Sequence, residues 1–261
     1  MWATKKLAFI SCVVLAVIVA SAQQYNVPFR PRAAAGGGGG NLLSETFDGA
    51  TGGYDNTWTE SGTGTIDQDE TAACGTGTGW SGDCLELVYT ASQTGKTTSA
   101  FAAGAQTGDV WVRLRAKVTY SVVPSNWFGI AGLSNTTATT AGGMLLEFHG
   151  FGGGPEISLR RATGGGVSTE LGFTAAPASG ETHCYEFYAN NNTDDWAFWI
   201  DGTCIDGSIS TDGCPSSAVA SGATIDPTNL WMLATDMDGV ASATIYIDDV
   251  QVSNVSRQTC S

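Results

Sequence analysis

Two segments near the middle of the chain carry side chains that could bind a polar ligand or transfer protons. The segment VWVRLRAKV alternates apolar residues with Trp111, Arg113 and Arg115, which an extended strand places on one side. The segment MLLEFHG places Glu147 and His149 together on one side of a second strand. Arginine offers several fixed donors, and a histidine with a carboxylate is suited to proton transfer. We expect one face of the fold to carry all five residues as a candidate ligand-binding site.

Tryptophan offers a large flat apolar face with one polar N–H, which suits stacking on a sugar ring. Most tryptophans of this chain are expected in the core, because large aromatic side chains are usually buried. Trp80 differs from the others, since it lies in a glycine-rich loop between two cysteines. Trp80 is therefore the predicted exposed platform.

Two carboxylates at strand spacing occur in the segment IDQDE. Asp67 and Asp69 would share a strand face there, and a retaining glycosidase needs two carboxylates about 5–5.5 Å apart. The segment runs directly into a cysteine-flanked loop, where acidic residues are usually solvated. We expect this pair to be non-catalytic, and the chain carries no glycosidase carboxylate motif.

Six cysteines lie beyond the apolar N-terminal segment, and an even number in an exported chain predicts disulfides. They are Cys74, Cys84, Cys184, Cys204, Cys214 and Cys260. Cys74 with Cys84 and Cys204 with Cys214 each enclose a short polar loop, so we expect local bonds there, which leaves Cys184 with Cys260. A zinc cluster is the alternative, but no two of these cysteines have the two-residue spacing typical of zinc sites.

The N-terminus has the features of a secretory signal peptide. Residues 1–22 contain Lys5 and Lys6, then a mostly apolar stretch, and end on small residues, so cleavage is expected after Ala22. The apolar stretch is too short to span a bilayer, which takes about 20 residues. Residues 23–40 contain two prolines followed by three alanines and five glycines, which predicts a flexible linker. We therefore expect a secreted protein that does not span a membrane.

The chain is strongly acidic, with 11 basic and 25 acidic residues. Loss of the two leader lysines leaves 9 basic residues against 25 acidic ones and a net charge of −16. Such a surface repels phosphate backbones, so nucleic acid is excluded as a partner. No pattern indicates the oligomeric state.

Residues 41–261 predict one all-β domain, a two-sheet antiparallel β-sandwich of the jelly-roll kind. Short β-rich segments are separated by clusters of glycine, serine, threonine and asparagine, and no window sustains a helical period. The apolar face changes parity at Asp248-Asp249, which predicts either a β-bulge or the end of the strand at this point. The expected strands are Val110–Val118, Trp127–Leu133, Met144–Phe151, Glu156–Arg161, His183–Ala189, Trp196–Asp201, Leu230–Ala234 and Ala243–Val252.

The order of several segments resembles the concanavalin A-like lectin and glucanase superfamily, and within it the LamG-type domain of extracellular proteins. The segments are NLLSETFDG, VWVRLRAKV, HCYEFYANN, DDWAFWIDGTCID and IYIDDVQVSN. The resemblance implies that the first strand pairs near the last. It also implies a structural calcium ion where these strands meet, with Glu45, Asp48 and the pair Asp248/Asp249 as the matching acids.

The resemblance implies a non-catalytic module that binds a glycan or glycoconjugate. An enzyme on the same fold, a polysaccharide lyase or a glycoside hydrolase, is the first alternative. MLLEFHG is similar to the Q-I-H-G string of alginate-lyase-like jelly rolls, but Glu147 replaces the neutralising amide, and Tyr185 or Tyr188 would complete the set. The second alternative is a structural or adhesive extracellular protein that binds other proteins.

Overall fold

The computed structural model describes most of the predicted domain in separate stretches. Nothing before residue 40 is described, so the predicted leader and linker lie outside the described residues, as do Asp48, Asp69 and Trp80. The described residues are 40–47, 55–62, 65–67, 74, 83–89, 95–100, 104–120, 127–134, 143–149, 155–163, 167–190, 192–208, 214, 227, 229–232 and 243–260. Within these stretches no helix is long and apolar enough to cross a membrane.

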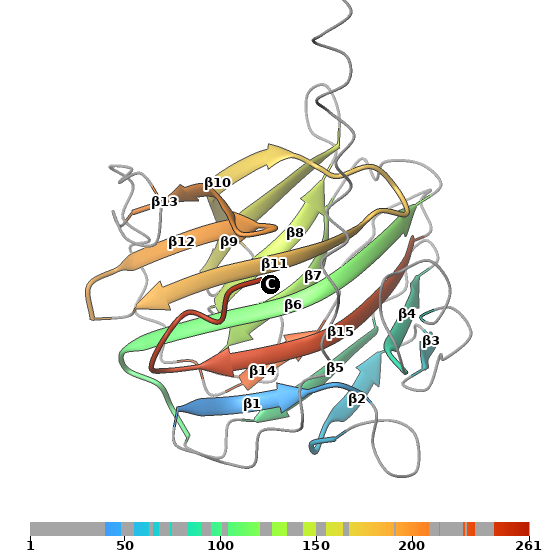
Figure 1. The fold of residues 1–261 in the computed structure, drawn as a ribbon, viewed down its shortest axis with the longest axis horizontal. Helices are drawn as coiled ribbons and strands as arrows, with labels where there is room; N and C mark the ends of the chain where they lie inside the picture. Colours follow the sequence, from blue (N-terminus) through green and yellow to red (C-terminus); the bar gives the residue numbers. More distant parts are fainter. Residues whose placement is uncertain are drawn as a thin grey trace, which may run out of the picture. The chain divides into compact units, whose positions relative to one another are not determined.

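The described strands form two antiparallel sheets, and the first lies in front of the second in Figure 1. The first sheet contains, in spatial order, β13 (Thr203–Gly207), β12 (Asp195–Ile200), β11 (Thr182–Asn190), β6 (Asp109–Tyr120), β15 (Ala243–Ser253), β4 (Leu85–Tyr89) and β3 (Thr65–Asp67), with β1 (Asn41–Glu45) also paired to β15. The second contains β10 (Val167–Ala175), β9 (Glu156–Thr163), β8 (Gly143–His149), β7 (Trp127–Ser134), β14 (Asn229–Met232), β5 (Gly95–Ala100) and β2 (Thr59–Gly62). The predicted all-β, two-sheet antiparallel sandwich is confirmed.

The core lies between the two sheets and follows from the alternation of each strand. In β6, Val112 and Leu114 are buried in the main core, whereas Arg113 between them points to the opposite face. In β8, Leu146 and Phe148 enter the same core from the second sheet. Each sheet therefore has an inner face in the core and an outer face, and the outer faces carry the charged side chains.

Strand β15 pairs with β1, β4 and β6 and contains the predicted bulge. Its register against β6 shifts between Asp248 and Gln251, and Asp249 has a φ of 52°. A left-handed residue at a bulge changes which side chains face the core, so Ile247 and Val250 are both buried there. The parity change at Asp248-Asp249 is confirmed, and the bulge turns Asp249 toward the arginines of β6.

Strand β10 was not predicted, because a bulge interrupts its alternation. Its register against β9 shifts between Glu170 and Gly172. A side chain at Gly172 would collide with the core ring of Trp196, since a Cβ there would lie 2.9 Å from the ring atom Cη2. The bulge places Glu170 and Phe173 on the outer face of the second sheet and Leu171 in the core.

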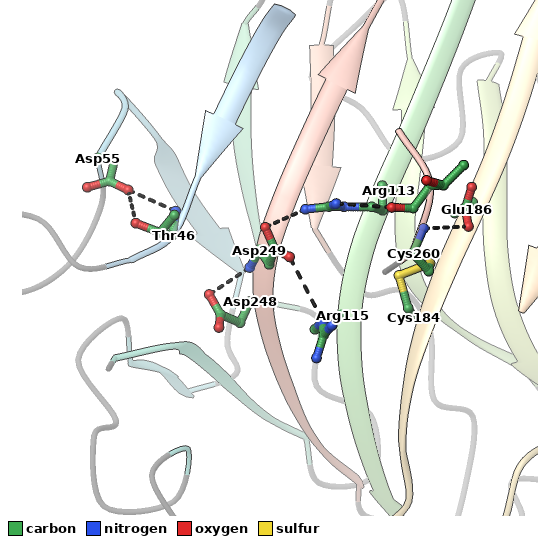
Figure 2. Close-up of polar contacts among 10 residues, drawn as sticks. Thr46, Asp55, Arg113, Arg115, Cys184, Glu186, Asp248, Asp249 and Cys260 are labelled. Carbon is green, nitrogen blue, oxygen red and sulfur yellow. Dashed lines mark hydrogen bonds and ion pairs between the residues drawn. A yellow bond between two sulfur atoms is a disulfide. The ribbon is translucent and has the colours of Figure 1, made fainter. Parts of the chain in front are cut away.

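All six cysteines are paired as the spacing predicted. The Cα atoms of Cys74 and Cys84 are 6.0 Å apart and those of Cys204 and Cys214 are 5.1 Å apart. The long-range pair Cys184 and Cys260 has a Cα separation of 5.9 Å and joins β11 to the C-terminal end (Figure 2). These separations lie in the ordinary range for disulfides.

Candidate ligand-binding face

The five residues predicted to share one face are divided between the two sheets. Trp111, Arg113 and Arg115 lie on β6 in the first sheet, and Glu147 and His149 lie on β8 in the second. Their neighbours in each strand enter the same core, so the two sets point to opposite outer faces of the sandwich. The expectation of one shared face is therefore wrong, because alternation fixes the side of a strand but not the sheet that the strand joins.

The two arginines of the first outer face are held by the last strand. The Arg113 guanidinium donates to Asp249 Oδ1, and its Nη1 lies 3.4 Å from the carbonyl oxygen of Thr259 (Figure 2). Arg115 Nε lies 3.9 Å from Asp249 Oδ2. The Arg113 side chain is only 7% exposed. These contacts make Arg113 a structural residue of the outer face.

Residues 254–260, which we call the C-terminal strap, lie across the same face. Glu186 on β11 accepts hydrogen bonds from Arg257 Nε and, at 3.1 Å, from the backbone N–H of Cys260. The Arg257 guanidinium lies 4.1 Å from the ring centroid of Trp199. The strap therefore packs on the buried charge and aromatic rings of the first sheet.

Trp111, which was predicted as part of the ligand-binding face, belongs to an aromatic cluster beside the strap. Its ring centroid lies 4.2 Å from that of Tyr188 and 5.9 Å from that of Trp199. Trp199 is fully buried, as is Trp196, which enters the main core from the other side of β12. Trp111 is thus partly used in packing, and Trp80 lies outside the described residues.

The second outer face carries a compact group of titratable side chains on β8, β9 and β10, which we call the His149 cluster. It consists of Glu147, His149, Glu156, Ser158, Arg160 and Glu170. The strand register places His149 opposite Glu156 and Glu147 opposite Ser158. Across the next pair of strands, Arg160 lies opposite Glu170. Sequence reasoning found the two members on β8 but missed the four on β9 and β10.

His149 lies between two carboxylates of neighbouring strands. Its Nε2 is 3.3 Å from Glu170 Oε2, and its Nδ1 is 3.7 Å from Glu156 Oε2. The imidazole is 2% exposed, whereas the two glutamate side chains are 30% and 32% exposed. The histidine therefore forms the floor of the cluster, and the glutamates form its solvent-facing edge.

Burial shifts the pKa values of both cluster residues on β8. Burial raises the pKa of Glu147 to about 7, and the negative charge of Glu170 adds to this rise. Arg160 opposes the rise, because its Nη1 lies 2.7 Å from Glu147 Oε1. Burial also lowers the pKa of His149, against the attraction of Glu170 and Glu156. At neutral pH Glu147 is thus partly protonated and His149 is mainly neutral. Shifts of this origin are common at binding and catalytic sites.

Phe173 is the exposed aromatic residue beside this cluster. The register places it opposite Ser158, and 55% of it is exposed. Among the described residues the only other large exposed apolar side chain is Val255, on the strap. The bulge in β10 hid Phe173 from pattern analysis, although the aromatic residue after Gly172 in TELGFTA was a usable signal.

Two of the acids assigned to calcium by resemblance, Glu45 and Asp249, already have protein partners. Glu45 accepts hydrogen bonds from the backbone N–H groups of Phe47, Asp55 and Asn56 and from Trp58 Nε1, at 2.6–3.1 Å. The oxygens of Asp249 face Arg113 and Arg115, as described above.

Glu45 and Asp249 therefore do not join any group of three converging metal-ligand atoms among the described residues. Asp48, the third predicted ligand, lies outside the described residues. Because one of the predicted ligands is not described, calcium binding stays a prediction.

The residues of the lyase-like alternative do not come together either. Tyr185 points into the main core, and Tyr188 lies in the aromatic cluster of the first outer face with its hydroxyl donating to Asp109 at 2.7 Å. Neither tyrosine is on the sheet that carries His149. Asp67 lies on β3 of the first sheet, and its predicted partner Asp69 is outside the described residues.

Comparison with known proteins supports the fold. No protein-family model matches the chain, and no curated protein matches its sequence. Solved structures that resemble it include the binding domain of botulinum neurotoxin DC in complex with rat synaptotagmin II, with a TM-score of 0.55 and 10% identity over 82% of this chain and 48% of that chain. The chain therefore spans about half the length of the neurotoxin domains it matches.

Two further structures match over most of their own length. The cellulose induced protein Cip1 has a TM-score of 0.56 and 15% identity, over 84% of this chain and 100% of that chain. The T. cruzi calreticulin globular domain has a TM-score of 0.52 and 14% identity, over 83% of this chain and 88% of that chain. These likenesses support the two-sheet β-sandwich, and at this identity they concern the fold only.

Proposed function

We propose that this chain is a secreted, non-catalytic carbohydrate-binding module with a LamG-type jelly roll, and that it binds glycans on the outer face of its second sheet. The observation that carries the proposal is the exposed Phe173 ring beside the His149 cluster. An exposed ring can stack on a sugar, while Glu156 and Glu170 accept hydrogen bonds from sugar hydroxyls.

Two further observations favour binding at this face. The first outer face is occupied by the strap, whereas the glutamates of the His149 cluster are about one-third exposed. One of the similar neurotoxin structures is described as depending on interaction with two ganglioside molecules for cell entry. That property belongs to the neurotoxin, of which this chain matches 48%, and it is a precedent for glycoconjugate binding by a protein that contains this fold.

The polysaccharide lyase alternative draws on Glu147 and His149, because burial raises the pKa of Glu147 to about 7, which suits proton transfer at neutral pH. Among the described residues, this alternative lacks the two arginines expected to neutralise a uronate, because Arg113 and Arg115 lie on the opposite outer face. Arg160, the arginine of the cluster, is itself paired with Glu147. The geometry therefore favours binding over catalysis.

The test is isothermal titration of the purified chain against a panel of neutral and uronate-rich polysaccharides, with a product assay in parallel. We expect weak binding, with a Kd of about 1 µM to 1 mM, and a preference for neutral glycans. Phe173→Ala should weaken binding about three- to tenfold, as expected for the loss of one stacked ring.

Val255→Ala is the matched control, because it truncates the other large exposed apolar side chain among the described residues, which lies on the strap. Equal effects of the two variants would reject the second outer face as the site. Absence of binding to any polysaccharide would favour the structural protein, and release of unsaturated product would favour the lyase.

A further inference from the structure

We infer that His149, Glu156 and Glu170 form a binding site for a divalent transition metal ion, with zinc as the best match. One ligand atom from each residue can be chosen so that all three lie within 4.8 Å of one another. The three residues come from three adjacent strands, β8, β9 and β10, so the hydrogen-bonded sheet itself fixes their spacing.

The separation between the histidine and one carboxylate already suits a zinc ion. Ligands of a tetrahedral zinc ion lie about 2.0–2.1 Å from the metal, which places any two of them about 3.3–3.4 Å apart. His149 Nε2 and Glu170 Oε2 are 3.3 Å apart. Glu156 approaches the imidazole from the other ring nitrogen, at 3.7 Å. Its side chain is 30% exposed, so a rotation about its flexible side-chain bonds can bring an oxygen to the same ion.

A second observation on the same face points to a ligand. Ser158 Oγ and Glu147 Oε2 are buried and have no hydrogen-bond partner among the described residues. Glu147 is two residues from His149 on β8, and Ser158 is two residues from Glu156 on β9, on the same outer face. Buried oxygens without a partner are costly. A water molecule bound to a metal ion at His149 could donate hydrogen bonds to both of these oxygens. Metal ligands in known sites are hydrogen-bonded to outer-shell groups in the same way.

The ligand types select the class of ion. An imidazole nitrogen with two carboxylate oxygens suits zinc or manganese, whereas calcium prefers an all-oxygen set. Three protein ligands leave a tetrahedral ion one open position. Because the glutamates are partly exposed and His149 is not, that position would face solvent and could hold water or an oxygen of a bound ligand.

The second histidine of the chain provides a comparison within the same molecule. His183 also has two carboxylate neighbours, with Nδ1 2.6 Å from Asp201 Oδ2 and Nε2 3.4 Å from Glu181 Oε2. Asp201 is already engaged, since its other oxygen accepts the backbone N–H of Cys184 at 2.9 Å. Among the described residues these three do not form a group of converging ligand atoms, whereas the His149 set does.

The experiment is zinc titration of the metal-stripped chain, purified without a histidine tag, followed by calorimetry and by thermal unfolding. We expect one zinc per chain and a higher thermal midpoint with zinc, because an ion that binds only the folded state stabilises it. Glu170→Gln preserves size and should weaken zinc binding at least tenfold. His149→Gln should abolish binding, and Glu181→Gln is the matched control that should leave it unchanged.

Glu170→Gln keeps the result interpretable if His149→Gln fails to fold, because Glu170 lies at the solvent-facing edge. Manganese should bind more weakly than zinc. Calcium should not bind at the concentrations at which zinc binds. No zinc binding by the unaltered chain, or equal losses in Glu170→Gln and Glu181→Gln, would overturn the proposal. The readout needs no glycan, so it can fail or succeed independently of the proposed carbohydrate binding.

Discussion

The two outer faces of the sandwich carry similar residue types but use them differently. On the first face the charges of Arg113 and Glu186 are paired with Asp249 and Arg257, and the C-terminal strap is bonded across them. On the second face the glutamates beside His149 remain about one-third exposed. The difference shows that arginine, glutamate and aromatic residues at strand spacing indicate an outer face of the sandwich. The partner of each charged side chain then decides whether that face is structural or accessible to a ligand.

The first comparison concerns the strap and is expected to have the largest effect. The Cys184–Cys260 bond closes a loop with a sequence separation of 76, against 10 for Cys204–Cys214. By loop-closure entropy, replacing Cys184 and Cys260 with serine should lower the free energy of unfolding by about 4–5 kcal/mol, and the same change at Cys204 and Cys214 by about 2–3 kcal/mol. Urea unfolding of the two double variants measures the difference.

Removal of the strap bond should also increase the solvent exposure of the Trp111 and Trp199 cluster. A red shift of tryptophan emission in the Cys184/Cys260 variant, at a urea concentration where it is still folded, would report this. An unchanged emission maximum together with a small stability loss would show that the strap stays in place through Glu186 and Arg257, without its covalent bond.

The second prediction separates an arginine partner from a calcium partner at Asp249. Arg113→Met keeps most of the packing but leaves the carboxylate without its closest cation, at a side chain that is 22% exposed. We expect a loss of about 2–3 kcal/mol, less than for a fully buried pair. Thermal or urea unfolding should give the same loss in calcium and in chelator.

A loss that appears only after chelation would support the calcium ion that the sequence resemblance implied. In that case chelation should also lower the midpoint of the unaltered chain. The described hydrogen bonds of Glu45 and Asp249 lead us to expect no such dependence.

The third prediction concerns His183, the histidine of the first sheet that is paired with Asp201. A hydrogen bond to Asp201 raises the pKa of His183 despite partial burial. Burial opposes the shift at Asp201, but the hydrogen bonds from His183 and from the backbone N–H of Cys184 lower its pKa overall. The His183 contribution is therefore full below pH 6.5 and is lost as pH rises through the folded pKa, and the Asp201 contribution is lost as pH falls below about 3.8.

The pair should thus stabilise the fold most between about pH 4 and pH 6.5. Its contribution is under about 1 kcal/mol, because the Asp201 side chain is 53% exposed and water screens the interaction. The measurement is the stability difference between the unaltered chain and His183→Gln at pH 5 and pH 8.5. A difference that does not shrink at the higher pH would show that charge on His183 contributes nothing.

Much of the architecture could be predicted from local patterns, whereas the candidate site could not. The alternation in β6 and the parity change at Asp248 follow from neighbouring residues, so both were correct. The placement of Arg113 and His149 on opposite faces depends on which strands pair, which is a long-range property of the chain. The bulge at Glu170 and Gly172 broke the period of β10, and with it the sequence signal for Glu170 and Phe173.

The smallest change in the free energy of unfolding is expected for Phe173→Ala. Leu171 and Phe173 lie on the same strand, but the bulge turns Leu171 into the core at 5% exposure and leaves Phe173 at 55%. Leu171→Ala should cost about 2–4 kcal/mol of unfolding free energy, while Phe173→Ala should stay within about 0.5 kcal/mol. Urea unfolding of both variants, beside the unaltered chain, provides the comparison.

A ring that contributes little to stability yet remains exposed is free to contact a ligand, so a near-zero result for Phe173→Ala supports the second outer face as a binding surface. A loss comparable to that of Leu171→Ala would instead mean that Phe173 packs against a part of the chain outside the described residues. Phe173 would then be structural, and the distinction drawn between the two outer faces would no longer hold.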